Sequence, residues 1–542
     1  MNENWNFESR RSPVLGTRGM VATSHPLAAM AGLQTLQNGG NAADAAVATA
    51  AALNVVEPTS TGIGGDCFAL YYDSNTRNIR CLNGSGRSGG AQTIAEMQSL
   101  GIQDFGEVST TAHSVTVPGA AMGWADTITR FGTMPLLDVL KPAIALAEDG
   151  IPVTPVISKL WVDSEDLLKG ASPHADEVLL NGRAPRAGEL WTNLNLARIF
   201  RDLGEGGPKA FYEGYAGENI VKVLEPLNGW LTEEDLSSHR SSFPDPISTQ
   251  YRDYRIWEHP PNGQGLIALI ALNILKSFDI REFDRRGPDL LHLLIDSVRL
   301  AFREGKSHIA DPDFHEVPVK ELLSDEHTLK LRGELDPAVC IAPNEGPEQV
   351  SDTVYLSVVD GAGNACSFIN SNYGGFGTGI VPMGCGFTLQ NRGSGFVLNP
   401  DHPNKLEPNK RPYHTIIPAL ITHADTNELF ASMGVMGGYH QPQGHVQTMI
   451  NLIDYDMNPQ AALDEPRFSI YRNPPWGIVS IEDSIPAPTI HELNRRGHHM
   501  DIATGSRRLG LFGRGQIIMR DRNSNVLWGG SDGRGDGAAV SW

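Results

Sequence analysis

Hydrophobic residues recur at helical spacing early in the chain and through much of its middle. The first helical segment begins at Ser24-His25-Pro26, continues as LAAMAGLQTLQ and stops at Asn38-Gly39-Gly40, which is typical of an N-cap, an early proline and a glycine stop. The second is the alanine-rich AADAAVATAAALNVV from Ala42, which ends before Pro58. Between about 100 and 340, the runs LLDVLKPAIALAEDG and LLHLLIDSVRLAFREG repeat the pattern. Helices are therefore predicted over these segments.

Strand patterns form one early hairpin and dominate the last third of the chain. CFALYYD and IRCLN flank the turn Asp73-Ser74-Asn75, which predicts a hairpin. A second hairpin is predicted from TVYLSVVD, the turn at 361–364 and ACSFINSN, with alternate residues from Val354 forming an apolar face. Further strand runs (TIIPALITH, LFASMGVMGG, GQIIMRD, VLWGGSD) are mixed with a helix over about 444–454. The pattern predicts an α+β chain with antiparallel sheet.

Composition narrows the classes of function. The 542 residues include 43 Lys and Arg against 63 Asp and Glu, a formal net charge of −20. Because phosphate affinity comes from clustered cations, this charge argues against a nucleic-acid partner. The chain has no run of 18 uncharged apolar residues, and its first twenty residues hold no apolar stretch of signal-peptide length. We expect a cytoplasmic protein with no membrane partner.

The spacing of cysteines and histidines indicates neither a disulfide framework nor a metal site. The five cysteines lie far apart and never form a CxxC pair, so buried free thiols are expected. The 17 histidines show no HExxH spacing, and His498-His499 lies in a polar stretch typical of a solvated surface pair. No metal and no cofactor are expected.

Two short glycine motifs overlap between residues 84 and 90. Gly84-x-Gly86-x-x-Gly89 lies between a strand pattern and a helical one, as in a dinucleotide site, but no acidic residue ends a second strand about 20 residues later. Gly86-Arg87-Ser88-Gly89-Gly90 has the GxSxG form of a nucleophile elbow, yet no partner histidine stands out. A chain with 58 glycines produces such matches by chance. A nucleotide-dependent oxidoreductase is kept as an alternative in addition to the two considered below.

The order of several longer motifs carries a family resemblance from Gly19 to the C-terminus. The run SHPLAAMAGLQTLQNGGNAADAAVATAAALNVVEPTSTGIGGDCF resembles the N-terminal signature of the gamma-glutamyltranspeptidase family. DTVYLSVVDGAGNACSF followed by GGFGTGI resembles the nucleophile segment of that family. PNKRPYHTIIP, GVMGGYHQPQGHVQ, LDEPRF and SDGRGDGAA then follow in the family's order.

The resemblance implies a fold and a maturation step. Members of the family are N-terminal nucleophile hydrolases, which have an αββα sandwich and cut themselves before a threonine. By motif that threonine is Thr353, and the scissile bond joins Asp352 to Thr353. The products, a large fragment 1–352 and a small fragment 353–542 carrying the nucleophile, are expected to stay together as one structural unit. The branch that the chain resembles suggests that this heterodimer dimerises further.

The resemblance also implies catalytic roles. A threonine hydroxyl needs a base within hydrogen-bond reach, and cleavage supplies one as the new α-amine of Thr353. Gly437 and Gly438 match the family's oxyanion pair, since glycines allow backbone N–H groups to approach a tetrahedral oxyanion closely. Ser371 matches a hydroxyl residue that supports the nucleophile. The acyl-enzyme on Thr353 is expected to pass to water or to an amine.

Departures from the family concern the substrate. Enzymes that act on gamma-glutamyl groups hold the α-amine with an acid, but LQNRGSGF places Gly395 there. A neighbouring position that is commonly glutamine is Arg392, and the asparagine contact is Tyr373. The chain therefore lacks the anchor for an α-ammonium group.

The residues that grip the α-carboxylate in the family also differ. The paired serines become His414 and Thr415 within RPYHTIIP, and the arginine of the first part of the chain is displaced to Arg87. Arg392 and Arg87 can still bind a carboxylate through charge-assisted hydrogen bonds. The expected substrate is a small amide whose acyl group bears a carboxylate without an adjacent amine. This resembles the branch of oxamate amidohydrolases and glutaryl-type cephalosporin acylases.

Two alternatives to a carboxylate-directed amidohydrolase remain open. One is a true gamma-glutamyl hydrolase or transpeptidase, acting on glutathione-type substrates, in which another residue replaces the lost acid. The other is a catalytically inactive relative that acts as a binding protein. The joint presence of Thr353, Gly437 and Gly438 argues against inactivity, because an inactive relative has no need to keep both the nucleophile and the oxyanion donors.

Overall fold

Two antiparallel sheets packed face to face form the centre of the molecule. The computed structural model describes residues 11–341, 353–471 and 477–542. A seven-stranded sheet has, in spatial order, β1 (Val14–Gly16), β17 (Leu527–Ser531), β16 (Arg514–Arg520), β12 (Leu429–Met436), β11 (Ala419–His423), β8 (Tyr254–Glu258) and β7 (Ile247–Tyr251). A six-stranded sheet has β18 (Ala538–Ser541), β2 (Gly19–Thr23), β9 (Val354–Asp360), β10 (Ala365–Ser371), β3 (Asp66–Asp73) and β4 (Asn78–Gly84). Each sheet takes strands from both sides of residue 352.

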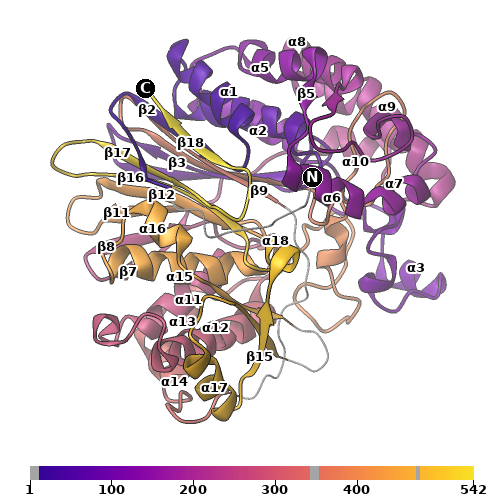
Figure 1. The fold of residues 1–542 in the computed structure, drawn as a ribbon. Helices are drawn as coiled ribbons and strands as arrows, with labels where there is room; N and C mark the ends of the chain where they lie inside the picture. The colour runs from indigo at the N-terminus through magenta and orange to yellow at the C-terminus, as the bar shows by residue number, and fades with distance from the viewer. Residues whose placement is uncertain (1–10, 342–352, 472–476) are drawn as a thin grey trace.

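Helices cover the outer face of each sheet, so the molecule has four layers (Figure 1). The six-stranded sheet is covered by α1 (Pro26–Gln37), α2 (Ala42–Val56), α4 (Ala120–Phe131), α5 (Leu136–Asp149) and α8 (Leu194–Tyr212). The seven-stranded sheet is covered by α11 (Gly265–Leu275), α12 (Pro288–His308) and α15 (His440–Ile453). A separate apolar cluster lies between the sheets. The α+β class and the αββα sandwich expected from the sequence are confirmed.

Shorter elements complete the described chain. The helices are α3 (Ile94–Ser99), α6 (Pro155–Asp163), α7 (Glu165–Ala171), α9 (Tyr215–Leu224), α10 (Glu233–Ser238), α13 (Val319–Leu322), α14 (Asp325–Arg332), α16 (Pro459–Asp464), α17 (Ala487–Arg495) and α18 (Arg508–Leu511). The strands are β5 (Ile151–Pro152), β6 (Leu190–Trp191), β13 (Phe468–Tyr471), β14 (Ile478–Glu482) and β15 (His499–Ala503). In this described part, no helix is both long and apolar enough to cross a membrane.

The two predicted helices at the N-terminus and both predicted hairpins are present, with small corrections. The N-cap of α1 is His25 and not Ser24, because Ser24 donates instead to Glu57. Helix α15 begins at His440, four residues before the predicted start, without a side-chain cap that a sequence pattern could reveal. The alanines of α2 are all buried, which lets this helix lie directly on the sheet and against α1 and α5.

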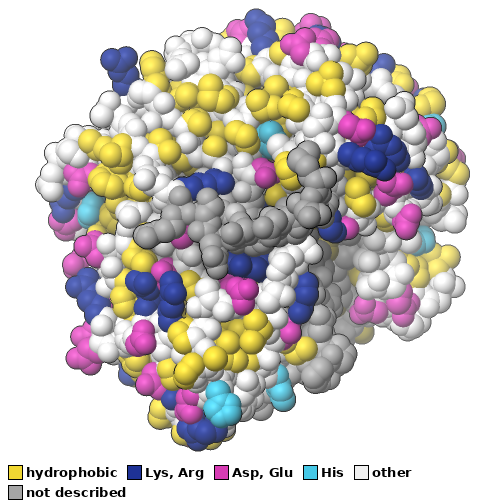
Figure 2. Space-filling view, in the orientation of Figure 1, with side chains coloured by type: hydrophobic (Ala, Val, Ile, Leu, Met, Phe, Trp, Pro, Cys, Tyr) yellow, Lys and Arg dark blue, Asp and Glu magenta, His cyan; other side chains and the backbone are white. Residues whose placement is uncertain are grey.

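The outer surface carries charges of both signs. On the face shown in Figure 2, acidic and basic side chains are interspersed rather than gathered into a basic stripe.

Four of the five cysteines are buried free thiols and Cys340 is partly buried, as expected from their spacing.

Candidate active site

Thr353 immediately precedes β9 and is fully buried. Its hydroxyl lies 3.0 Å from the hydroxyl of Ser371, the last residue of β10. Because Asn370 pairs with Val354 in the antiparallel ladder, Ser371 comes to lie opposite Thr353. The structure thus brings together the predicted nucleophile and its predicted support. Asp352, the other side of the predicted scissile bond, lies outside the described residues.

The predicted oxyanion glycines lie at the end of β12, in the opposite sheet. Gly437 and Gly438 have φ angles of 134° and 55°, in a turn that leads directly into α15. A Cβ on Gly437 would lie 3.0 Å from the Cα of Gly513, so a side chain does not fit without a shift. Among the described residues, neither glycine N–H donates a turn or loop hydrogen bond to another backbone group.

Contacts across the sandwich place these glycines beside Thr353. Ser357 donates to the hydroxyl of Ser432 at 2.7 Å. Two residues nearer the start of β9, the ring of Tyr355 packs against Gly434, where a Cβ would lie 2.5 Å from the ring. Following the same step along both strands, Thr353 lies level with the end of β12 and the glycine turn.

Arg392 is fully buried next to the hydroxyl of Ser371. Its Nη2 donates to Ser371 Oγ at 3.1 Å and its Nη1 to Thr415 Oγ1 at 2.8 Å, while the guanidinium lies 4.5 Å from the centre of the Tyr373 ring. Burial lowers the pKa of Arg392 to about 10, although the charge of Asp66 opposes the shift, so the side chain remains a cation at neutral pH. Among the described residues, no carboxylate forms an ion pair with it. Two hydroxyls are its hydrogen-bond partners.

Gln264, which sequence reasoning missed, connects the two halves of the site. Its Nε2 donates to the carbonyl of Thr415 at 2.6 Å and to that of Gly438 at 2.9 Å. Its Oε1 accepts from the hydroxyl of Tyr413 at 2.9 Å. Gln264 therefore links the segment that contacts Arg392 to the glycine turn. It precedes an apolar helix, and no local pattern marks it.

Asp66, also missed, is a buried hub between segments that are distant in sequence. Its Oδ1 accepts from the N–H of Gly86 and Gly119, both at 3.0 Å, and from Gln390 Nε2 at 2.9 Å. Its Oδ2 lies 2.7 Å from His414 Nε2. Both oxygens are thereby used within the protein. The predicted substrate contact His414 thus directs one ring nitrogen at this carboxylate.

The charge states of this pair follow from its surroundings. Burial alone would raise the pKa of Asp66, but hydrogen bonds from His414 and Gln390 and the charge of Arg392 lower it below its ordinary value. Burial, followed by the charge of Arg392, lowers the pKa of His414 despite its bond to Asp66. The arrangement is an ionised Asp66, a neutral His414 and a cationic Arg392.

Asp66 should make folding stability depend on pH. Its carboxyl has a lower pKa in the folded than in the unfolded chain, where the value is about 3.9. The unfolded state therefore binds more protons, and the stabilisation is complete above about pH 5 and lost as the pH falls through the folded pKa. We expect the urea midpoint of Asp66→Asn to fall less steeply between about pH 5 and 3 than that of the parent. Parallel curves would contradict the assignment.

The glycine motif around Arg87 is a packing device in this structure. A Cβ on Gly86 would lie 1.6 Å from the carbonyl of Val117, so the motif lies directly against another backbone segment. Ser88 donates to the carbonyl of Glu407 at 2.7 Å and is not exposed as a nucleophile. Arg87 Nη2 lies 3.1 Å from Asp313 in a partly exposed ion pair. Its predicted role in binding a substrate carboxylate stays a prediction.

One buried histidine corrects the sequence analysis. His498 is not solvated: its Nε2 lies 2.8 Å from His292 Nδ1 and its side chain is 2% exposed, although His499 is exposed. His292, Asp296 and His498 are close enough together to hold a metal ion. Arg299 Nη1, however, lies 3.1 Å from Asp296 Oδ1 and 3.2 Å from His498 Nδ1. A guanidinium already supplies the positive charge in this cluster.

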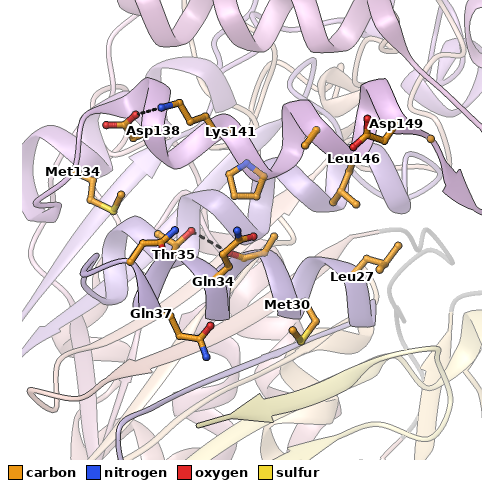
Figure 3. A pocket seen from close by; sticks show the side chains of 15 residues that line it. Leu27, Met30, Gln34, Thr35, Gln37, Met134, Asp138, Lys141, Leu146 and Asp149 are labelled. Carbon is orange, nitrogen blue, oxygen red and sulfur yellow. Dashed lines mark hydrogen bonds and ion pairs between the residues drawn. The ribbon is translucent and has the colours of Figure 1, made fainter.

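Two hollows differ in their relation to the site. One, of about 510 Å³, is lined by Gly395, by the segment that follows it and by Tyr413 and Tyr439, which are neighbours of His414 and Gly438. The other, of about 780 Å³, is a groove between α1 and α5 whose lining includes Leu27 and Met30 (Figure 3). No predicted site residue lines that groove. The smaller hollow adjoins the site through Gly395, Tyr413 and Tyr439, although Thr353, Ser371 and Arg392 do not line it.

An αββα sandwich with a buried threonine at the start of a central strand, facing a glycine turn, defines the N-terminal nucleophile hydrolase class. The family model for gamma-glutamyltranspeptidase matches residues 28–542, so the chain belongs to the gamma-glutamyltranspeptidase family of hydrolases. The Glutathione hydrolase-like YwrD proenzyme of Bacillus subtilis (strain 168) is 35% identical over 531 residues, which cover 97% of this chain and 99% of the relative.

Other relatives are named for different activities. The oxamate amidohydrolase proenzyme of Klebsiella pneumoniae is 32% identical over 538 residues, covering 97% of this chain and 99% of the relative. The crystal structure of a cephalosporin acylase from Bacillus halodurans superposes with a TM-score of 0.91 at 42% identity, covering 100% of this chain and 99% of the other. The family resemblance drawn from the motifs is confirmed. The names of these relatives refer to different substrates, namely glutathione, oxamate and cephalosporin.

Proposed function

We propose that the chain is a self-processing amidohydrolase that cleaves small amides whose acyl group bears a carboxylate. Its nucleophile is Thr353, released as a new N-terminus by cleavage after Asp352. Relatives described as proenzymes support this maturation step. Both sheets contain strands from 1–352 and from 353–542, which supports a processed pair that remains one unit.

The reaction proceeds through an acyl-enzyme. Thr353 Oγ1 attacks the amide carbonyl carbon while its proton passes to the α-amine, and the tetrahedral oxyanion accepts hydrogen bonds from the N–H groups of Gly437 and Gly438. The carbon–nitrogen bond then breaks and the leaving amine takes the proton. Water attacks the resulting ester, gives its proton to the α-amine, and releases the acid and the free hydroxyl. Ser371, 3.0 Å from Oγ1, orients the nucleophile.

The observation that carries the substrate assignment is the buried charge of Arg392. A guanidinium removed from water is costly unless a negative charge compensates it, and Asp66, the acid whose charge it feels, is already saturated by four hydrogen bonds. A substrate carboxylate bound by Arg392 and the Thr415 hydroxyl would supply that negative charge. It would lie close to the acyl group that is attached to Thr353. Tyr373, whose ring lies against the guanidinium, would complete this subsite.

The site also disfavours an α-ammonium group. At Gly395, the position of the family's acid, a Cβ would lie 2.6 Å from the carbonyl of Tyr413. No acidic side chain fits there with this backbone. A glutaryl or oxamate group, which carries a carboxylate without an α-amine, therefore suits the site better than a gamma-glutamyl group.

A gamma-glutamyl hydrolase or transpeptidase is the second candidate. The names of relatives such as the Glutathione hydrolase-like YwrD proenzyme favour it, and it would share Thr353, Gly437 and Gly438. A binding protein without activity is the third reading. The placement of Thr353 against Ser371 and opposite the glycine turn argues for catalysis.

Rates on matched anilides separate these candidates. We expect kcat/KM for glutaryl-p-nitroanilide to exceed that for gamma-glutamyl-p-nitroanilide by at least about tenfold, because an unpaired ammonium costs 1–3 kcal/mol or more when buried. Release of ammonia from oxamate, measured beside them, tests the shorter acyl group. Turnover of the gamma-glutamyl anilide alone would sink this assignment and favour the second candidate. No turnover of any amide by the self-cleaved protein would favour the binding protein.

A further inference from the structure

A buried ion pair lies near the start of β9 and takes no part in the reaction as described above. Glu57 follows α2 and is 0% exposed, and Arg514, the first residue of β16, is 3% exposed. Arg514 Nη1 lies 3.0 Å from Glu57 Oε1. The same carboxylate accepts from Ser60 Oγ at 3.0 Å and from Ser24 Oγ at 2.5 Å. Burying both charges is costly, so their location calls for a reason.

The hydroxyl partners of Glu57 belong to segments on either side of Thr353. Ser24 follows Thr23, the last residue of β2. The hydroxyl of Thr23 donates to the carbonyl of Tyr355 at 3.1 Å. Since β2 runs antiparallel to β9, Ser24 lies further toward the start of β9. On the other side, the carbonyl of Ser60 accepts from the N–H of Asn372, the residue after Ser371, at 3.5 Å. Glu57 thus bridges both neighbours of β9 at its first residues.

Arg514 approaches the same point from the other sheet. It pairs with Met436 in the ladder between β16 and β12, and Met436 directly precedes Gly437. The pair of Glu57 and Arg514 therefore ties the sheet that carries Thr353 to the sheet that carries the oxyanion glycines.

We propose that Glu57 and Arg514 position the new α-amine of Thr353 and set how much of it is unprotonated at neutral pH. This inference rests on the proposed role of that amine as the base. An α-amine has an ordinary pKa of about 7.7–8.0 and can accept the hydroxyl proton only when it is neutral. A nearby guanidinium disfavours the ammonium form and a nearby carboxylate favours it. Because the two charges lie side by side, their effects nearly cancel. The pKa of the amine therefore stays near its ordinary value, so that part of it is neutral at neutral pH.

Among the residues that the structure describes, the other titratable groups around this point are neutral histidines or charges that lie near an opposite charge. Burial lowers the pKa of His25, on the β2 side, to about 4. Burial, and then the charge of Arg467, lowers the pKa of His440 on α15 well below its ordinary value. Among the described residues, Arg392 feels the charge of Asp66 without an ion pair, and Arg467, Arg508 and Arg534 pair with Asp532, Glu482 and Asp483. Removing one member of the pair of Glu57 and Arg514 therefore changes the net charge beside the amine.

The test is the pH dependence of kcat/KM for glutaryl-p-nitroanilide, measured on self-cleaved protein from about pH 5.5 to 9.5. The acid limb reports the protonation of the base in the free enzyme. Glu57→Gln removes a negative charge beside the guanidinium, so its acid limb should move about 1 unit lower. Arg514→Gln leaves a carboxylate uncompensated, so its limb should move about 1 unit higher. In the double variant both charges are gone, and the limb should return to within about 0.3 unit of the parent.

A matched control removes a buried carboxylate from a different arginine pair. Asp454 follows the far end of α15 and lies 2.9 Å from Arg252 Nε. Asp454→Asn should leave the acid limb in place. If the single-charge variants fail to self-cleave, Ser60→Ala is read instead: it removes one hydrogen bond from the Glu57 carboxylate, so the limb should move up by about 0.3 unit or more.

Opposite shifts support the inference, whereas activity losses with unmoved limbs in all variants, Ser60→Ala included, overturn it and indicate a merely structural pair. Thr353→Ala, assayed beside them, distinguishes failure of the proposed nucleophile from failure of the role of the ion pair. Hydrolysis that survives in Thr353→Ala overturns the proposed function and this inference with it. Unmoved limbs in enzymes whose activity depends on Thr353 overturn the role of the ion pair alone.

Discussion

Thr353→Ala is expected to abolish both the self-cleavage of the chain and its hydrolysis of amides. The change removes the hydroxyl that we propose attacks the carbonyl in both reactions. Ser371 does not replace this hydroxyl for two reasons. The Ser371 hydroxyl already accepts from the N–H of Tyr373 and from Arg392 Nη2, and Ser371 lies within the chain and so has no free α-amine to act as a base. An intact-mass spectrum under denaturing conditions should show one chain of 58.7 kDa, and kcat should fall by at least about 10⁴-fold.

A buried threonine outside the site provides the matched control for this loss. Thr127 is fully buried and donates to the carbonyl of Gly123 within its own helix at 2.7 Å. Thr127→Ala should still yield two fragments whose boundary lies between Asp352 and Thr353, with little change in kcat. A Thr353→Ala chain that is still cut at that bond would contradict the assignment of the nucleophile. A parent chain that stays uncut after long incubation would count against self-processing itself.

The candidate site residues could be predicted through the resemblance to the family's motifs, and these motifs lie at the ends of strands that the sequence pattern marks clearly. Alternation and turn residues mark β9, β10 and β12; Thr353 directly precedes β9, Ser371 is the last residue of β10 and Gly437 directly follows β12. The order of the motifs then shows which strand ends belong together. Helical spacing and strand alternation predict the α+β class with antiparallel sheet, whereas the paired sheets are implied by the family resemblance.

The supporting residues could not be predicted, because tertiary packing alone brings them together. Asp66 meets His414 across 348 positions of sequence, and Gln264 meets Gly438 across 174. His498 was expected at the surface because its neighbours are polar, but its side chain turns inward to His292. The polarity of neighbouring residues in sequence is a poor guide to the burial of a side chain when its contacts come from a distant part of the chain.

Arg392→Gln should raise the KM for glutaryl-p-nitroanilide far more than it lowers kcat. The guanidinium is fully buried, so a carboxylate bound to it forms charge-assisted hydrogen bonds without competition from water. Truncating one partner of such a pair costs about 2–5 kcal/mol, or roughly 30- to 5000-fold in affinity. Arg392→Lys should recover little, since one ammonium does not reproduce the fork that bridges Ser371 and Thr415.

Two comparisons show whether the effect belongs to the carboxylate and to this arginine. Butyryl-p-nitroanilide is the glutaryl compound with its terminal carboxylate replaced by hydrogen. Its KM should therefore change little in Arg392→Gln, whereas a general distortion of the site would raise the KM for both anilides. Arg87→Gln tests the second predicted anchor, whose guanidinium is partly exposed and already paired with Asp313. Because water screens that site, its effect should be the smaller one. A larger effect in Arg87→Gln than in Arg392→Gln would move the carboxylate subsite to the first part of the chain and leave the buried charge of Arg392 to a structural role.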